Sequence, residues 1–296
     1  MVLSSCLRGE LGINVRYYMI LRLTTTVMAT ATALLLFAVR VEGRTWRLAS
    51  DGSGDVMYIS AAMDSAAVGD TVLVAAGDYE IGPVVFADGI VLISEEGPLR
   101  TKLFPLAESK GGLACSCLTR PIVISGFWFD HFDQGGNEGS GAINIFFCFS
   151  ATIRNCIFSH NDLAGIVISN TRPAVVENCT FVDNVRALHI SAGSWGQVSH
   201  SILWDSTFGL QSFVVYCNDV LNLQDVPLPY QSGNFSADPQ FCMMGDYRIT
   251  TESPCAPGNS PLGGACSLIG AIPPDCTTTP VESRTWGSIK ALYRKQ

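Results

Sequence analysis

Side chains able to bind sugars or metal ions recur at one position of the sequence, two residues after a phenylalanine or leucine. The residues at this position are His131, His160, Asp183 and Asp205. Carboxylates supply the hard oxygen ligands that Ca²⁺ prefers, whereas imidazoles suit Ca²⁺ poorly. Both groups also hydrogen-bond to hydroxyls, so the set, with Asp130 beside it, predicts a carbohydrate-binding surface. The alternative is a row of solvated turn residues whose polar side chains bond only to the backbone.

An aromatic side chain lies close to the last member of this set. Trp204 directly follows a leucine that should point inward, so strand alternation predicts an outward indole ring. Sugars stack on such rings face to face; burial under a C-terminal loop is the alternative. The sequence identifies no catalytic residue and predicts no metal or other cofactor, with Ca²⁺ left open. The predicted binding residues are Asp130, His131, His160, Asp183, Asp205 and Trp204.

A repeat of about 22 residues must position these side chains. Four segments share an aliphatic first residue and a Phe or Leu at the sixth position: 124–129, 153–158, 176–181 and 198–203. A second apolar column runs in phase with the first: Ile143, Ile166, Leu188 and Leu210. Apolar residues alternate within each run, which is typical of strands. Short strands at this period predict one solenoid coil per repeat, with equivalent residues stacked in rows.

The two ends of a solenoid need caps, since open strand edges would otherwise pair with other chains. Residues 59–66 place apolar side chains at helical spacing, which predicts a short capping helix before a first strand at 71–74. Five of the 11 cysteines crowd residues 217–276, which predicts an irregular end tied by disulfides. Among the pairings, Cys255 with Cys266 is favoured. Residues 277–296 are expected to form a linker and a short amphipathic segment.

The N-terminal residues are typical of an export signal. An apolar stretch, Val27–Val39, follows Arg16 and Arg22, and cleavage is expected after Gly43. An uncleaved anchor is the alternative, and the natural start is either Met1 or Met19. The formal net charge of −8 and the lack of a basic cluster argue against nucleic acid as a partner. We therefore expect a secreted, cell-surface or periplasmic protein without a transmembrane segment in its mature chain.

Several segments are similar to those of a known family. Residues 51–55, 58–62, 69–74 and 76–79 resemble the opening of pectin-lyase-like β-helix proteins, and residues 124–203 resemble the repeats of secreted bacterial proteins of that superfamily. Segments 237–241, 245–248 and 253–256 are similar to their closing region. The resemblance implies a fold more than an activity, because this fold hosts lyases, hydrolases, esterases and binding proteins. The paired aspartates and arginine of pectinesterases are absent, and only Trp128–His131 resembles a pectate lyase motif.

Together these features predict an all-β chain: a right-handed parallel β-helix with a short N-terminal capping helix and an irregular, disulfide-tied C-terminal region. The expected divisions are a signal peptide at 1–43, the β-helix domain at 44–276 and the C-terminal segment at 277–296. The function expected is binding of an extracellular polysaccharide or a cell-envelope partner, without catalysis. The alternatives are a polysaccharide lyase or pectinesterase-like enzyme, and a purely structural surface protein. The sequence leaves the oligomeric state open.

Overall fold

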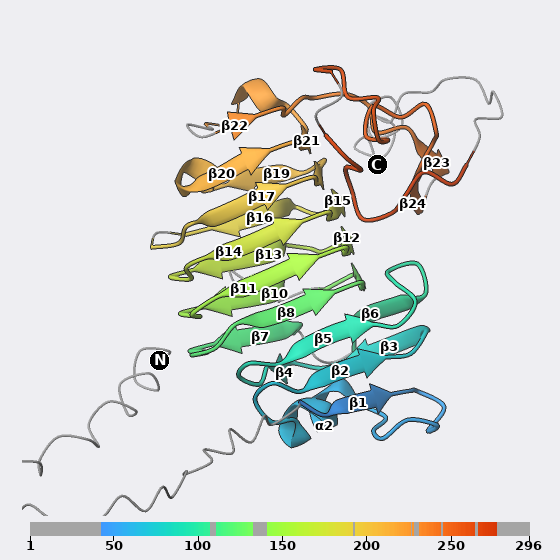
Figure 1. Cartoon of the computed structure of the whole chain (residues 1–296), viewed down its shortest axis with the longest axis vertical. Coiled ribbons are helices and arrows are strands. Elements are labelled where there is room, and N and C mark those ends of the chain that lie inside the picture. The colour runs from blue at the N-terminus through green and yellow to red at the C-terminus, as the bar shows by residue number, and fades with distance from the viewer. Residues whose placement is uncertain are drawn as a thin grey trace, which may run out of the picture. The chain divides into compact units, whose positions relative to one another are not determined.

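In the computed structural model, successive coils of the chain add strands to three parallel sheets, and most coils add one strand to each (Figure 1). The structure describes residues 43–106, 111–132, 141–191, 193–225, 227, 231–243, 245–263 and 266–276, which all lie in the unit from Glu42 to Gln296. The predicted signal peptide up to residue 42 and the predicted segment 277–296 lie outside these residues. Among the described residues, no helix has the length and apolar character needed to cross a membrane.

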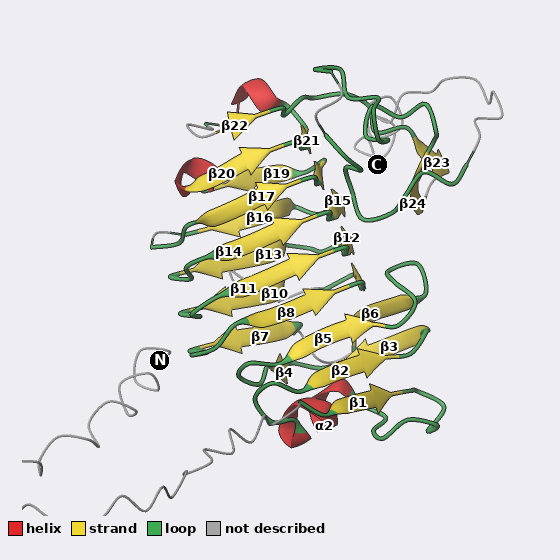
Figure 2. Cartoon of the chain, in the orientation of Figure 1, coloured by secondary structure: helices red, strands yellow, loops and turns green. Residues whose placement is uncertain are grey.

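The three sheets follow the coil order of the chain (Figure 2). Sheet A contains β1 (Thr45–Leu48), β2 (Thr71–Val74), β5 (Val91–Ser94), β8 (Ile122–Ser125), β11 (Ala151–Arg154), β14 (Ala174–Glu177), β17 (Gly196–Ser199), β20 (Phe213–Tyr216) and β22 (Gln231–Ser232). Sheet B contains β3 (Gly77–Ile81), β6 (Thr101–Pro105), β9 (Trp128–Asp130), β12 (Ile157–Ser159), β15 (Thr180–Val182), β18 (Ile202–Leu203) and β21 (Asp219–Val220). Sheet C contains β4 (Val84–Val85), β7 (Leu113–Ser116), β10 (Gly141–Phe146), β13 (Ala164–Ser169), β16 (Arg186–Ile190) and β19 (Ser206–Phe208). This arrangement is a parallel β-helix.

The interior consists of rows of apolar side chains, because strand alternation turns every second residue inward. In sheet B, Phe129, Phe158 and Phe181 pair in register across β9, β12 and β15, and all three are fully buried. In sheet C, Ile166 pairs with both Ile143 and Leu188. The predicted rows are confirmed in these coils, which explains why the repeat was visible in the sequence.

The last coil of sheet C departs from the predicted spacing. Leu188 pairs with Thr207 and not with Leu210, after a register shift between Arg186 and Leu188. Leu210 instead begins a short 3-10 turn, η1 (Leu210–Ser212). The prediction for Leu210 was wrong because this coil reaches sheet C with fewer residues than the coils before it.

Many of the corners between strands are tight because they begin with a residue in the left-handed backbone region. Glycine and asparagine adopt this region at the lowest cost. After sheet A the corner residues include Gly126, Asn155, Asn178, His200, Cys217 and Gly233. After sheet B they are His131, His160 and Asp183, and after sheet C they include Cys117, Phe147, Asn170 and Gly209. Three of the four recurring polar residues, His131, His160 and Asp183, are therefore left-handed corner residues.

Buried amide side chains connect the coils next to these corners. Asn161 Nδ2 donates to Asn184 Oδ1 at 2.6 Å, and Asn184 Nδ2 donates to Asp205 Oδ2 at 2.7 Å. A second pair lies after sheet A, where Asn218 Nδ2 donates to Asn234 Oδ1 at 2.9 Å. These bonds satisfy polar groups that the tight corners bury.

The N-terminal end is covered by helix α2 (Ile59–Ser65), whose Ile59, Ala62 and Met63 are buried against the first coils. The capping helix is confirmed, but the first strand was wrongly placed. Strand β1 (Thr45–Leu48) precedes β2 and pairs with it. The sequence of β1 indicates a strand only weakly, because the strand is short and Arg47 separates its two apolar residues, Trp46 and Leu48.

At the other end, the chain folds back along the outer face of sheet B. We call the described residues between 241 and 276 the C-terminal strap; it contains the antiparallel pair β23 (Phe241–Met243) and β24 (Asp246–Ile249). The main-chain N–H of Ala271 donates to Thr180 Oγ1 at 3.0 Å, and Asn178 Nδ2 donates to the Leu268 carbonyl at 2.8 Å. The strap therefore covers the middle and late coils of this face (Figure 1).

Disulfides tie the strap, as expected, although the favoured pairing was wrong. Cys217 is bonded to Cys266, and Cys242 is bonded to Cys276. Cys255 is a free, buried thiol whose Sγ lies 3.4 Å from Asp219 Oδ2. Spacing alone suggested a short loop, whereas the fold brings the corner residue Cys217 next to the strap.

Candidate functional site

Asp130 ends strand β9 and carries a carboxylate that is almost fully buried, with 2% of its side chain exposed. Ser159 Oγ donates to Oδ1 at 2.7 Å, and His160 Nδ1 lies 3.0 Å from the same oxygen. The other oxygen, Oδ2, contacts the Lys102 ammonium and lies 2.9 Å from His131 Nδ1. Burial would raise the pKa of this carboxyl, but these four partners together hold the pKa well below its ordinary value.

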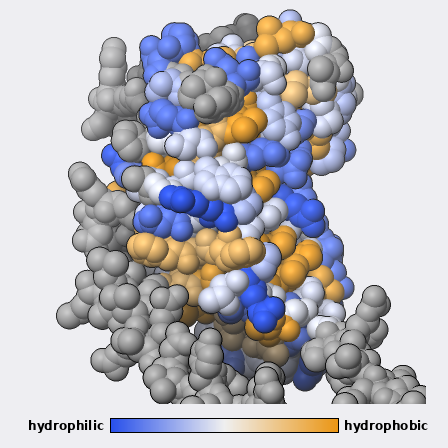
Figure 3. Space-filling model, turned by 60° about the vertical axis from the view of Figure 1, so that its left-hand side comes forward, coloured by the Kyte–Doolittle hydropathy of each residue, from blue (hydrophilic) through white to orange (hydrophobic). Residues whose placement is uncertain are grey.

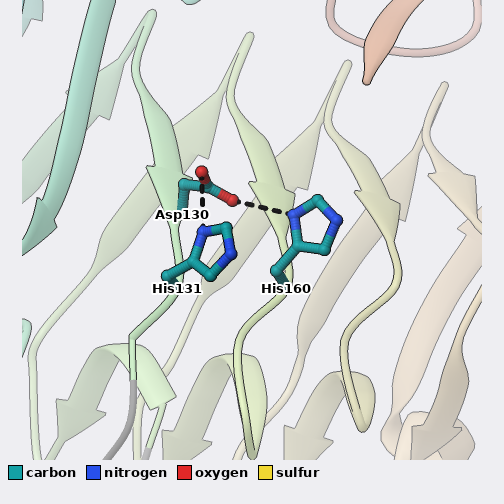
Figure 4. Close-up of side chains that lie close together, drawn as sticks. All are labelled: Asp130, His131 and His160. Carbon is teal, nitrogen blue, oxygen red and sulfur yellow. Dashed lines mark hydrogen bonds and ion pairs between the residues drawn. The ribbon is translucent and has the colours of Figure 1, made fainter. Parts of the chain in front are cut away.

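The strand register brings these groups together from separate coils. Asp130 and Ser159 are direct partners across β9 and β12, and each is followed by a histidine in the left-handed conformation. The rings of His131 and His160 therefore stack, with centroids 4.7 Å apart and planes inclined by 18° (Figure 4). Both rings turn Nδ1 toward the carboxylate of Asp130.

The carboxylate is held in place from behind by a short relay. Trp128 Nε1 donates to Ser159 Oγ at 2.7 Å, which leaves the Ser159 hydroxyl hydrogen for Asp130. Trp128 itself packs between Lys102, whose Nζ lies 4.6 Å from the ring centroid, and the edge of Tyr247 in the strap. The hydrogen bonds from Trp128 to Ser159 and from Ser159 to Asp130 therefore fix the orientation of the carboxylate in the absence of a ligand.

The two imidazoles differ from Asp130 in being open to solvent. The side chains of His131 and His160 are 65% and 42% exposed. The hydrogen bond to Asp130 raises the pKa of His160 above its ordinary value, against the opposing effect of burial. The His160 imidazole is thus biased toward its charged form by a buried negative partner.

A hollow of about 360 Å³ opens beside this cluster, over the early coils of sheet B that the strap leaves uncovered. Its lining residues are Asp78, Lys102, Phe104, Pro105, Asp130 and His131. Lys102 pairs with Asp78 on one side and with Trp128 on the other in the sheet register. The hollow thus combines apolar side chains with charged groups, among which Lys102 and His131 both contact Asp130.

The repeat pattern predicted that Asp130, His131 and His160 lie close together, but it did not indicate their partners Lys102 and Ser159. Lys102 and Phe104 lie in β6, outside the four repeat segments, and Ser159 gave no signal as a single small polar residue. The outward positions of β6 become informative only when its register with β9 is known.

The two remaining aspartates of the predicted row separate in the structure. Asp183 occupies the corner after β15, with a left-handed φ of 62°. Asp205 is buried, and its carboxylate accepts the Asn184 amide, so it ends the asparagine row and does not face solvent. The shortened last coil causes this difference, since Ser206 already pairs with Arg186.

Trp204 lies under the strap and not on an open face. Its ring packs with the apolar residues of the strap, and its Nε1 donates to Asp219 Oδ2 at 3.2 Å. Burial raises the pKa of Asp219 to about 7. An exposed tryptophan does occur elsewhere, at Trp195, which is 51% exposed. On the visible part of the face in Figure 3, hydrophobic and hydrophilic side chains are mixed.

Comparison with known families bears on the winding of the coils. Residues 118–219 match the family model described as a right handed beta helix region. The chain contains a right-handed β-helix region. The predicted fold class, a right-handed parallel β-helix, is therefore confirmed.

The solved structures that are similar to this chain include a distant likeness. A pectin methylesterase from carrot is similar over 66% of this chain and 89% of its own, with 10% identity and a TM-score of 0.30. A likeness at this level says nothing about activity. A search of the curated proteins found no match to this chain.

Proposed function

We propose that this protein is exported and binds an extracellular polysaccharide, or a glycan of the cell envelope, in the hollow beside Asp130. The observation that supports the proposal best is the composition of the hollow. Phe104 and Pro105 contribute apolar surface, while Lys102, Asp130 and His131 contribute charged or polar groups. Such a mixture of an apolar surface and a few fixed polar groups is typical of ligand sites.

The chemistry of sugars matches this lining. A pyranose ring offers C–H groups that pack on an aromatic face and hydroxyls that bond to fixed polar atoms. The Lys102 ammonium and the exposed imidazole of His131 can donate, while Asp78 can accept. An open hollow on a β-helix face also admits a segment within a long chain, whereas an enclosed cavity would require a chain end.

The proposed location rests on the cysteines and the N-terminal sequence. Two disulfides tie the C-terminal strap, and disulfides persist in oxidising compartments outside the cytosol. The apolar stretch at 27–39 and the expected cleavage after Gly43 agree with secretion, or with a cell-surface or periplasmic location.

The binding proposal is tested by affinity electrophoresis and calorimetry against polygalacturonate, methyl-esterified pectin, alginate, xylan and cellulose. We expect retardation by at least one of these glycans and a loss of at least ten-fold in affinity for Phe104→Ala. Trp195→Ala is the matched control, since it removes an exposed aromatic ring elsewhere and should retain binding. Absence of binding to the whole set, or equal loss in both variants, would refute a site in this hollow.

A second candidate function is catalysis on a polysaccharide, and one observation favours it. The imidazole of His160 is hydrogen-bonded to a buried carboxylate and is partly exposed, which is an arrangement suited to general acid–base work. Release of methanol or of unsaturated products from the same glycans, abolished by His160→Gln, would favour the enzyme over the binding protein. No turnover with retained binding would favour the binding protein.

A further inference from the structure

We propose that Asp130, His131 and His160 form a binding site for a divalent transition-metal ion of the Zn²⁺ class. One carboxylate oxygen and one nitrogen from each ring lie within 4.8 Å of one another. The cluster shares Asp130 and His131 with the hollow of the proposed glycan site, but binding of the metal ion does not depend on binding of a glycan.

The donor atoms are close to the separations that one ion requires. Zn²⁺ binds imidazole nitrogen at about 2.0–2.1 Å and carboxylate oxygen at about 2.0–2.2 Å, which places tetrahedral ligands about 3.3 Å apart. Asp130 Oδ2 already lies 2.9 Å from His131 Nδ1, and Asp130 Oδ1 lies 3.0 Å from His160 Nδ1. The set of one oxygen and two nitrogens spans up to 4.8 Å, so the imidazoles must move closer to bind one ion, and both are exposed side chains that can rotate.

The surroundings of the three residues resemble the support that metal ligands need. Ser159 fixes the Asp130 carboxylate and is itself fixed by Trp128, so the least mobile ligand is oriented by a second layer of hydrogen bonds. Both histidines sit at equivalent corners with left-handed φ values of 60° and 51°. The solvent-exposed side of the rings leaves room for water or a ligand to complete the coordination.

The donor set decides which ion fits. Two imidazoles and one carboxylate suit borderline transition metals, whereas Ca²⁺ takes six to eight oxygen ligands. The cluster offers only the two oxygens of Asp130, and Lys102 already contacts one of them. A site of this composition therefore discriminates against Ca²⁺. The ion proposed here differs from Ca²⁺, the ion that the sequence left open as a cofactor.

Lys102 is the internal competitor of the metal ion. Its ammonium contacts Asp130 Oδ2 and lies over the Trp128 ring, so a bound ion must displace it or share the carboxylate. Repulsion between two cations weakens binding. Replacing Lys102 with Met keeps an unbranched side chain that is one atom shorter, removes the charge, and should raise the affinity for Zn²⁺ about ten-fold.

The test is a titration of the chelator-treated, disulfide-intact protein with Zn²⁺ by calorimetry and with Co²⁺ by visible absorption. We expect one equivalent of either ion, Co²⁺ bands typical of nitrogen and oxygen ligands, and no comparable heat with Ca²⁺. His131→Ala and His160→Ala should each lower the affinity at least ten-fold. His189→Ala is the matched control, since it removes a histidine of sheet C outside the cluster.

Several outcomes would overturn the proposal. They are no Zn²⁺ or Co²⁺ binding by the wild type and by Lys102→Met, binding that survives both histidine variants, and a preference for Ca²⁺. Circular dichroism of each variant separates loss of the site from loss of the fold. Glycan binding measured in chelator is a separate readout, so failure of one proposal leaves the other distinguishable.

Discussion

Phe158 and Phe181 stack face to face on successive coils, with ring centroids 4.7 Å apart and ring planes inclined by only 5°. This separation matches the spacing of neighbouring strands, about 4.7–4.9 Å. The rings are therefore parallel because they lie at equivalent positions of neighbouring parallel strands, so the stacking follows directly from the register of the coils.

Truncation of the central ring should be costly. Phe158→Ala removes the ring between Phe129 and Phe181 and leaves a cavity in a fully buried row, so we expect a loss of about 3–5 kcal/mol in the free energy of unfolding. Chemical denaturation measures this loss. Phe149→Ala is the control, because Phe149 is 60% exposed and its truncation should change stability by about 0.5 kcal/mol or less.

The asparagine row makes a separate contribution. Asn184→Ala leaves the buried amide of Asn161 and the carboxylate of Asp205 without their shared partner, so we expect a loss of about 2–3 kcal/mol. Asn155→Gly is the control, since Asn155 is an exposed corner residue whose positive φ suits glycine. Similar losses in both variants would contradict a specific contribution of the buried bonds.

Much of the fold could be predicted because an inward row repeats the same kind of residue in every coil. Phe129, Phe158 and Phe181 form a pattern that the amino-acid sequence alone displays. The cluster around Asp130 was only half visible: the histidines share the repeat position, but Lys102 comes from a coil outside the pattern. The predicted position of Asp205 differs from the observed one because the corner between β18 and β19 is shorter than the equivalent corner of the coil before it. The sequence pattern gives no sign of such a deletion.

Burial of Asp219 gives a testable pH dependence. Its pKa is about 7 in the folded protein and close to 3.8 when unfolded, so the folded state holds a proton that the unfolded state releases. This contribution to stability is fully present below pH 3.8 and is lost as the pH rises toward 7. Denaturation at pH 5 and pH 8 should show a decrease in the wild type, and Asp219→Asn should reduce that decrease. An unchanged pH dependence in the variant would assign it to other groups.

The disulfide between Cys217 and Cys266 should hold the strap to the last coils. Cys217→Ser with Cys266→Ser should lower stability by about 2–4 kcal/mol, since the bond closes a loop of 49 residues in sequence separation. Peptide mapping without reductant should recover the Cys217–Cys266 pair and the Cys242–Cys276 pair. Recovery of a Cys255–Cys266 peptide would contradict the structure.

The first described strand begins close to the expected signal cleavage site. The main-chain nitrogen of Arg44 donates to Asp70 Oδ1 at 2.7 Å, and Asp70 also accepts from Trp46 Nε1 at 2.9 Å. Cleavage after Gly43 would turn this nitrogen into a charged terminus beside a buried carboxylate. We expect mass spectrometry of the secreted protein to find Arg44 first, and Asp70→Asn to destabilise it by about 1.5–3 kcal/mol. A mature protein that retains residues 1–43 would exclude this cleavage.

The strap imposes an order on the synthesis of this protein. Ile157 and Val182 lie on the outer face of sheet B and become dry only when Tyr247, Ala271 and Ile272 pack over them. Domains begin to fold from the N-terminal side as the chain emerges. The coils that carry Ile157 and Val182 can therefore stack before the strap is synthesised, and the strap residues that cover these two side chains come last among the described residues. A chain that ended before the strap would keep these coils but leave Ile157 and Val182 exposed on the outer face of sheet B.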